Sequence, residues 1–126
     1  MRFSRSMPSR TEAQVGKTTV AGGNAAVFTD GEYRGVRVFS PGGYVWRPAV
    51  GDDVLVLKTP DGTYALGAET VGAPEDMQPG DVFVRAASGA SVYLKTDGTV
   101  LVSGDVSVRG RVDIEGSLYI NGTEIV

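Results

Sequence analysis

The chain of 126 residues contains no cysteine and no histidine. Without cysteine it has no disulfide and no thiolate ligand for a metal. Without histidine it lacks the commonest general base, the catalytic triads built on that residue, and the usual ligand of transition metals. Both absences argue against an enzyme, so we expect no catalytic residue, no cofactor and no metal site.

Positive charge is also scarce, because the formal net charge is -3. That balance argues against a protein that binds nucleic acid, since the neutralisation of phosphates drives such binding. The one basic segment lies at the N-terminus, where Arg2, Arg5, Arg10 and Lys17 outnumber a lone Glu12. We expect this segment to contact another protein rather than phosphate.

Long apolar runs are missing too. The N-terminal residues include no apolar segment of the kind that a secretory signal needs, and no run is long enough to span a bilayer. The sequence therefore predicts a protein that is made and matured in the cytosol.

Glycine is abundant, at 18 positions, and it separates short apolar segments of period two. Segments 14–21, 25–29 and 33–40 show this alternation and predict three strands. Residues 52–69 predict a hairpin whose turn is Pro60-Asp61-Gly62. About five strands in about 70 residues suit a small closed barrel.

After the Pro- and Gly-containing segment 72–80, aliphatic residues fall almost only on even positions. Strands usually end near ten residues, so about forty residues of such alternation need corners. Glycine recurs at every sixth position, and we predict corners at Gly98, Gly104, Gly110, Gly116 and Gly122. Each hexad then places two aliphatic side chains on the inner face of a β-solenoid. The predicted inward-facing residues are Val100, Val102, Val106, Val108, Val112, Ile114, Leu118 and Ile120.

One chain is too short to build this solenoid alone. Residues 98–126 hold five hexads. At three hexads per coil these make fewer than two coils, whereas roughly three stacked repeats are needed to bury a continuous core. Three chains wound together would complete five layers, so we predict an intertwined triple-stranded β-helix, a trimeric β-prism, that folds only as a homotrimer.

These patterns divide an all-β chain into four segments. We predict an N-terminal arm at residues 1–14, a barrel at 15–72, a linker and barrel-to-shaft transition at 73–97, and the shaft at 98–126.

Glu124 departs from the hexad pattern, because it occupies an even, inward position. Three carboxylates buried at one level of a trimer would be costly. We expect the prism to fray or to shift register there, with Ile125 or Val126 capping its end.

Three longer segments point to a family. Residues 36–67, "VRVFSPGGYVWRPAVGDDVLVLKTPDGTYALG", combine a strand, a Pro-Gly-aromatic turn, a Gly-Asp pair and a hairpin. In this order, and followed by "GASVYLKTDGTVLVSGDVSV" at 89–108 and "GSLYINGTEI" at 116–125, the chain resembles the central spike of contractile phage tails, above all the baseplate spike of Mu-like and related phages.

This resemblance implies an oligonucleotide/oligosaccharide-binding (OB) type of barrel that seats the trimer beneath the tail hub, with the shaft pointing at the target cell. Pro41, Tyr44 and Trp46 are the candidate barrel contacts with the hub. We interpret Tyr44 and Trp46 as subunit contacts or barrel packing rather than as a platform for stacked bases. The implied partners are hub and baseplate proteins, reached through the barrel and the arm, and transiently the cell envelope.

Two features differ from that family. Its spikes often end in a His-x-His segment that holds iron, and this chain has no histidine, so no such ion is carried over. The shaft is also short and stops at Val126. A separate tip protein, or a blunt plug in place of a piercing apex, would explain that ending.

The sequence therefore predicts a structural, non-enzymatic homotrimer: the central spike or plug at the cell-facing tip of a tail baseplate, assembled in the host cytoplasm. Three alternatives stay open. A trimeric tail fibre or adhesin would need a recognition head, an OB-fold oligonucleotide-binding protein would need more positive charge, and a hexapeptide-repeat acyltransferase fragment would need the histidine such enzymes usually employ.

Three local motifs have simple structural interpretations. "VGKTT" at 15–19 resembles the end of a phosphate-binding loop, but Thr11 stands where that loop requires glycine, so we predict a strand. Asp52 and Asp53 are expected to be solvated turn residues rather than a catalytic or cation-binding carboxylate pair. "NGT" at 121–123 predicts a turn.

Overall fold

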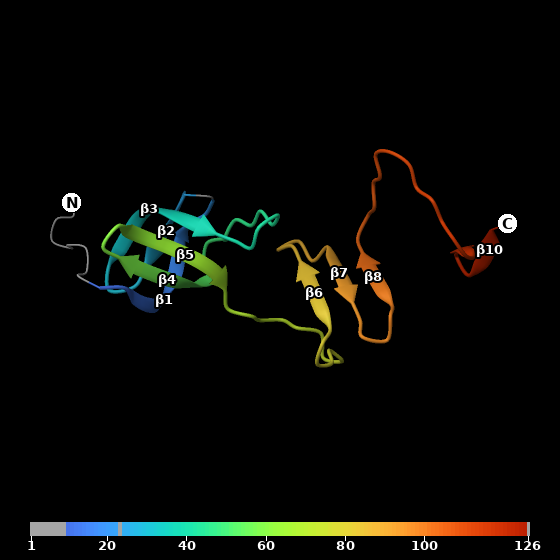
Figure 1. Ribbon diagram of the computed structural model, residues 1–126, viewed down its shortest axis with the longest axis horizontal. Helices are drawn as coiled ribbons and strands as arrows, with labels where there is room; N and C mark the ends of the chain where they lie inside the picture. Colours follow the sequence, from blue (N-terminus) through green and yellow to red (C-terminus); the bar gives the residue numbers. More distant parts are fainter. Residues whose placement is uncertain (1–9, 23, 126) are drawn as a thin grey trace. The chain divides into compact units, whose positions relative to one another are not determined.

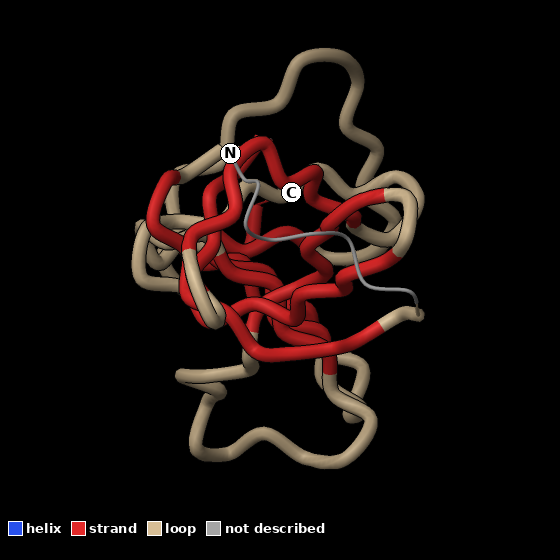
Figure 2. The backbone as a smooth tube through the Cα atoms, turned by 90° about the vertical axis from the view of Figure 1, so that its left-hand side faces the viewer, coloured by secondary structure: helices blue, strands red, loops and turns tan. Residues whose placement is uncertain are grey.

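The computed structural model describes residues 10–22 and 24–125, and every regular element in them is a β-strand (Figure 1). Figure 2 shows these strands joined only by loops and turns, so the described residues include no helix that could cross a membrane. One compact unit ends at Glu75 and a second begins at Asp76. The first unit contains β1 (Glu12–Val20), β2 (Asn24–Phe28), β3 (Glu32–Phe39), β4 (Asp53–Thr59) and β5 (Gly62–Ala68). The second contains β6 (Val82–Arg85), β7 (Ser91–Leu94), β8 (Val100–Ser103), β9 (Leu118–Ile120) and β10 (Thr123–Ile125).

The strands of the first unit close into a barrel in the order β1-β2-β3-β5-β4. Neighbouring strands are antiparallel except β3 and β5, which run parallel. The predicted all-β class and small closed barrel are confirmed. The predicted hairpin is β4–β5, with Pro60 and Asp61 in its turn.

The barrel begins earlier than the sequence predicted. Glu12, Ala13 and Gln14 were assigned to the arm, but they belong to β1 and pair with β4. Gln14 is fixed there by its side chain, whose Oε1 accepts a hydrogen bond from Lys58 Nζ at 2.9 Å. Residues 1–9 of the predicted arm lie outside the described residues.

Five small side chains fill the barrel, and each is at most 1% exposed: Val27, Val36, Val54, Val56 and Ala65. Tyr33, Val38 and Trp46 pack against this cluster. Alternate side chains of β4 point into the barrel, because successive side chains of a strand point to opposite faces. The apolar core is therefore complete within one chain.

Gly16 lies in close contact with side chains from both sides of β1. A Cβ atom there would stand 2.8 Å from Val56 Cγ2 and 2.9 Å from Thr29 Cγ2. The predicted strand interpretation of "VGKTT" is confirmed, because these residues belong to β1. The glycine serves close packing in the barrel.

A buried cation lies in the barrel as well. Lys58 is 4% exposed, and its Nζ contacts Asp30 Oδ1 at 3.0 Å and lies 4.6 Å from the centre of the Tyr33 ring. The hydrogen bond from Lys58, followed by one from Thr29, lowers the pKa of Asp30 to about 2. The ammonium group thus has partners that compensate its burial.

In the second unit, β6, β7 and β8 form an antiparallel three-stranded sheet. The sequence assigned residues 73–97 to a linker and transition, yet they contain β6 and β7. β8, at the start of the predicted shaft, pairs with β7 in the same chain. Tight turns explain both pairings of β7. Gly89 lies between β6 and β7 and Gly98 between β7 and β8, and their positive φ lets the chain reverse.

The end of the chain differs from the predicted solenoid. β9 and β10 pair as a hairpin around Asn121 and Gly122, which both have positive φ, as the two central residues of a type I′ turn do. The predicted turn at "NGT" is therefore present. Gly122 is a hairpin residue rather than a corner between successive hexads.

This hairpin also explains the misplaced Glu124. Antiparallel pairing sets Glu124 opposite Tyr119 and Ile125 opposite Leu118. Because paired residues share a face, Glu124 lies on the face away from Leu118, and Ile125 takes the aliphatic side. The hairpin thus accounts for the side-chain position of Glu124 within one chain, and fraying or a register shift of a prism there stays a prediction. Val126, the other predicted cap, lies outside the described residues.

Candidate self-association surface

One face of the β6–β7–β8 sheet is entirely aliphatic. The strand register places Val82, Leu94 and Val100 in one row across the sheet. A second row holds Val84, Val92 and Val102. These six side chains are 37–58% exposed. We call them the aliphatic face.

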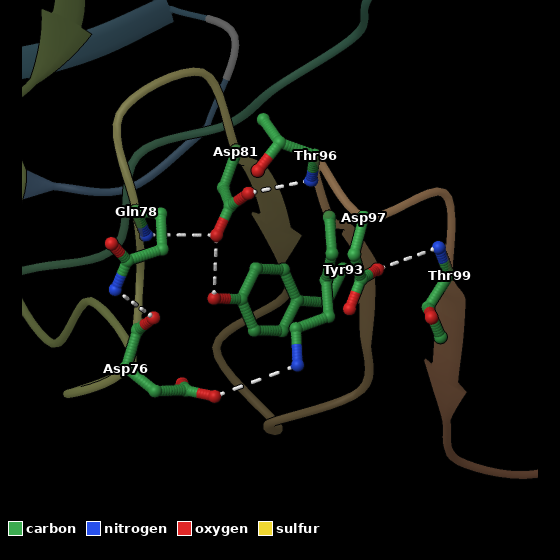
Figure 3. Close-up of polar contacts among 8 residues, drawn as sticks. Asp76, Gln78, Asp81, Tyr93, Thr96, Asp97 and Thr99 are labelled. Carbon is green, nitrogen blue, oxygen red and sulfur yellow. Dashed lines mark hydrogen bonds and ion pairs between the residues drawn. The ribbon is translucent and has the colours of Figure 1, made fainter.

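The opposite face of this sheet is held by a buried carboxylate, Asp81 (Figure 3). Its Oδ2 accepts hydrogen bonds from the Gln78 backbone N–H at 2.8 Å and the Tyr93 hydroxyl at 3.0 Å. Its Oδ1 accepts one from the Thr96 backbone N–H at 2.7 Å. The side chain therefore ties the start of β6 to β7 and to the turn that follows it.

These contacts change the acidity of both side chains. The backbone hydrogen bonds from Gln78 and Thr96 favour the charged carboxylate and lower the pKa of Asp81 to about 2. Burial, and then the hydrogen bond to Asp81, raises the pKa of Tyr93 to about 12. The carboxylate is thus ionised and the phenol neutral across the physiological range.

Neighbouring groups support the same turn. Lys95 Nζ lies 3.5 Å from Asp76 Oδ2, and Asp97 Oδ1 accepts a hydrogen bond from the Thr99 N–H at 2.9 Å (Figure 3). Phe83 packs edge-on against Tyr93, with ring centres 5.4 Å apart. The sheet is therefore well fixed on its polar and aromatic face, while its aliphatic face has no such cover.

Residues 104–117 carry further exposed aliphatic side chains. Within the described ranges this segment joins no strand pair. Its aliphatic side chains, which are 54–67% exposed, are Val106, Val108, Val112 and Ile114. Gly104, Gly110 and Gly116 have φ values of 133°, 123° and 123°, which glycine adopts far more readily than other residues. We call residues 104–117 the unpaired segment.

All predicted inward-facing residues are exposed in the single chain. Val100 and Val102 belong to β8, the next four to the unpaired segment, and Leu118 and Ile120 to β9. Gly98 lies in the turn between β7 and β8. The even-numbered aliphatic side chains of the second unit thus lie on the aliphatic face, in the unpaired segment and on β9.

The candidate hub contacts lie in the loop between β3 and β4. Tyr44 N–H donates to Pro41 O at 3.0 Å, which closes a tight turn, and the Tyr44 side chain is 63% exposed. Trp46 packs against the barrel core instead. The two aromatic residues also line a shallow hollow of about 280 Å³, together with Val38, Ser40, Val45 and Arg47.

The paired carboxylates do not act together. Asp52 Oδ2 accepts a hydrogen bond from the Ala49 N–H at 2.9 Å, within the turn before β4. Asp53 belongs to β4 and pairs with Lys17 at 2.9 Å, so it is not the solvated turn residue that the sequence predicted. Among the described residues, no group of three acidic side chains is placed to hold a metal ion.

Sequence reasoning missed Asp81, because it assigned this position to a linker. A signal was present: Asp81 follows Pro79-Gly80 and directly precedes the even-position valines of β6. An aspartate at such a point commonly accepts hydrogen bonds from nearby backbone N–H groups.

Neither protein-family models nor curated proteins give a match to this chain. Within residues 10–22 and 24–125, the aliphatic side chains of the second unit are exposed and its unpaired segment joins no strand pair. Such an arrangement suits assembly with further strands.

Proposed function

We propose that this protein is a structural homotrimer, the central spike or plug at the tip of a phage tail or a related injection particle. The observation that carries the proposal is the unpaired segment. An extended chain with exposed aliphatic side chains and unpaired backbone groups is incomplete as a monomer, because both features gain stability from neighbouring strands.

A threefold assembly supplies what the segment lacks. Three unpaired segments, wound around one axis and turning at Gly104, Gly110 and Gly116, would form hydrogen bonds between chains and turn their aliphatic side chains inward. Each buried aliphatic side chain contributes roughly 1.5–3 kcal/mol before the entropy of ordering is subtracted. Folding of this segment and trimer formation are then one event.

The aliphatic face adds to the core of the same trimer. Three β6–β7–β8 sheets with this face inward make a triangular prism, and Asp81 and Tyr93 remain on its outer side. The intertwined part is shorter than the sequence indicated, because β8 pairs within its own chain and β9–β10 is a local hairpin.

The barrel is the module that seats the trimer on the tail. Its five strands, their order and the crossover that places β5 between β3 and β4 are consistent with an OB-like barrel. The turn at Pro41 and Tyr44 extends an exposed aromatic side chain toward a partner protein of the hub.

The mechanism is mechanical. Strands that are hydrogen-bonded between chains leave no open lateral edge, and they unfold slowly because all three chains must separate. Such a rod transmits axial force and leaves the particle ahead of the tube or the genome. Its position in the virion is the cell-facing tip of the baseplate.

Electron microscopy with an antibody tests this role. The antibody is raised against the purified protein and applied to tail particles released by cells that carry the gene. We expect label at the tip, on the tail axis. Label on lateral fibres would favour a fibre or adhesin, and particles without label would contradict the proposal.

A further inference from the structure

The outside of the barrel carries an apolar stripe. The strand register aligns Val15 of β1, Leu55 of β4, Leu66 of β5 and Phe39 of β3 in one row. Leu57 and Tyr64 lie beside this row on β4 and β5. We call these six residues the barrel stripe.

Three residues of the stripe are exposed and the other three are half-buried, although the stripe crosses four strands. Val15 is 65% exposed, Phe39 49% and Leu55 46%. The inward residues of the same strands, such as Val54 and Val56, are at most 1% exposed. Because these strands already bury one face, a contiguous apolar row on the other face indicates a contact surface.

Charged side chains lie at both ends of the stripe. Lys17 Nζ pairs with Asp53 Oδ1 at 2.9 Å next to Val15 and Leu55. At the other end, Arg37 keeps its positive charge and lies over the Tyr64 ring, with 5.2 Å between its Cζ and the ring centre. At the end with the ion pair, copies of this surface can meet without strong repulsion between like charges.

The stripe is too small to hold two free molecules together. Stable interfaces bury about 1,200–2,000 Å² in total and 20–30 residues on each side, far more than six side chains offer. Tethering changes that balance, because a short linker gives an effective concentration on the order of millimolar. Residues 69–75 span at most about 25 Å when extended, so three barrels joined to one shaft stay close.

We propose that the barrel stripe faces the threefold axis and packs against the stripes of the two other copies in the same trimer. This inference rests on the proposed trimer. It assigns a second role to the barrel, which then holds the three copies together in addition to the shaft. The occupant of the stripe is thus a second copy of this chain.

Cysteine cross-linking tests the contact, because the natural chain has no cysteine. Leu55→Cys places a thiol at the centre of the stripe, and Asn24→Cys places one at an exposed site on β2. Both full-length variants are treated with a short bismaleimide after their native mass has been measured. We expect at least tenfold more cross-linked dimer from Leu55→Cys, and equal cross-linking would overturn the inference.

A second variant tests the same contact by repulsion. Leu55→Lys places three ammonium groups at the axis, and Leu55 is exposed enough for the monomer to accept the change. We expect a trimer of unchanged mass whose radius of gyration, measured by X-ray scattering, increases because the barrels separate. An unchanged radius would overturn the inference alone, whereas monomeric mass in the natural protein would overturn the proposed trimer and this contact together.

Discussion

The barrel and the unit that follows it differ in where they keep their apolar side chains. In the barrel, Val27 and Val56 have no exposed surface. In the described part of the second unit, Tyr93 is the one hydrophobic side chain that is buried. The barrel buries an apolar cluster within a single chain, whereas the described residues of the second unit form short strands and tight turns around one buried aromatic side chain.

This difference teaches how to interpret an exposed periodic pattern. Scattered surface valines are common and need no explanation. Here the aliphatic residues from Val82 to Ile120 stay almost entirely on even positions, through a sheet, an unpaired segment and the first strand of a hairpin. A pattern this regular, exposed throughout the part of the second unit that the structure describes, is expected of a subunit that completes its core by assembly.

The largest expected effect comes from a charge placed on the aliphatic side of the unpaired segment. Val108→Asp would bring three carboxylates together at the axis, which is costly in an apolar interior. We expect complete loss of the trimer, measured as mass by light scattering. The matched control is Ser107→Asp, on the other parity, which should remain trimeric. If Val108→Asp remained trimeric, it would contradict the assignment of the even-numbered side chains to the trimer interior.

A smaller effect is expected at a glycine of the unpaired segment. Gly110 has φ of 123°, and another residue held in such a region costs about 1–3 kcal/mol in each chain. Gly110→Ala should lower the melting temperature of the trimer by several degrees and leave the barrel unchanged. Ser107→Ala is the control. Calorimetry that finds equal melting of the two variants would argue against a corner at Gly110.

The barrel can be weakened separately through Gly16. Gly16→Ala would force its new methyl group against Val56 and Thr29, and overpacking of this kind costs about 1–3 kcal/mol. The control is Gly42→Ala, where a Cβ meets no atom within 4 Å and φ is not positive. Denaturant unfolding followed by Trp46 fluorescence measures the barrel, since Trp46 is the one tryptophan and packs on its core. Equal stability of the two variants would contradict the packing at Gly16, and the trimer should persist in both.

The smallest effect concerns pH. Because the pKa of Asp81 is lowered in the folded chain to about 2, its stabilisation is present above the ordinary pKa near 4 and is lost as pH falls through about 2. The Gln78 and Thr96 amide protons, followed by NMR, should titrate with a midpoint near 2. Asp81→Asn should abolish this titration. A midpoint near 4 in the natural protein would show that the carboxylate is not held by these hydrogen bonds.

Local pattern was enough to predict the barrel. Alternation and turn residues identify β2, β3 and the β4–β5 hairpin, because each depends on neighbours close in sequence. The start of β1 at Glu12 was missed, since it depends on pairing with β4, more than forty positions away. The need for glycine at position 16 was hidden for the same reason: Val56 and Thr29 come close only after the barrel closes.

In the second unit, the sequence was enough to predict which side chains share a face but not which strands pair with each other. The sequence indicates which side chains share a face, and the register of β6–β7–β8 keeps them together. It does not reveal that β8 pairs within its own chain, because alternation is the same for strands paired within or between chains. Asn121-Gly122 could have been predicted as a hairpin, since that dipeptide favours a type I′ turn, and the misplaced Glu124 would then have been explained.

The mass of the natural protein in solution tests the central claim most directly. Native mass spectrometry or light scattering on the folded chain should give three copies, with slow hydrogen exchange of the backbone amides at 105–109 and 111–115. A folded monomer would contradict the account, and so would a trimer in which these amides exchange as fast as in an unstructured peptide.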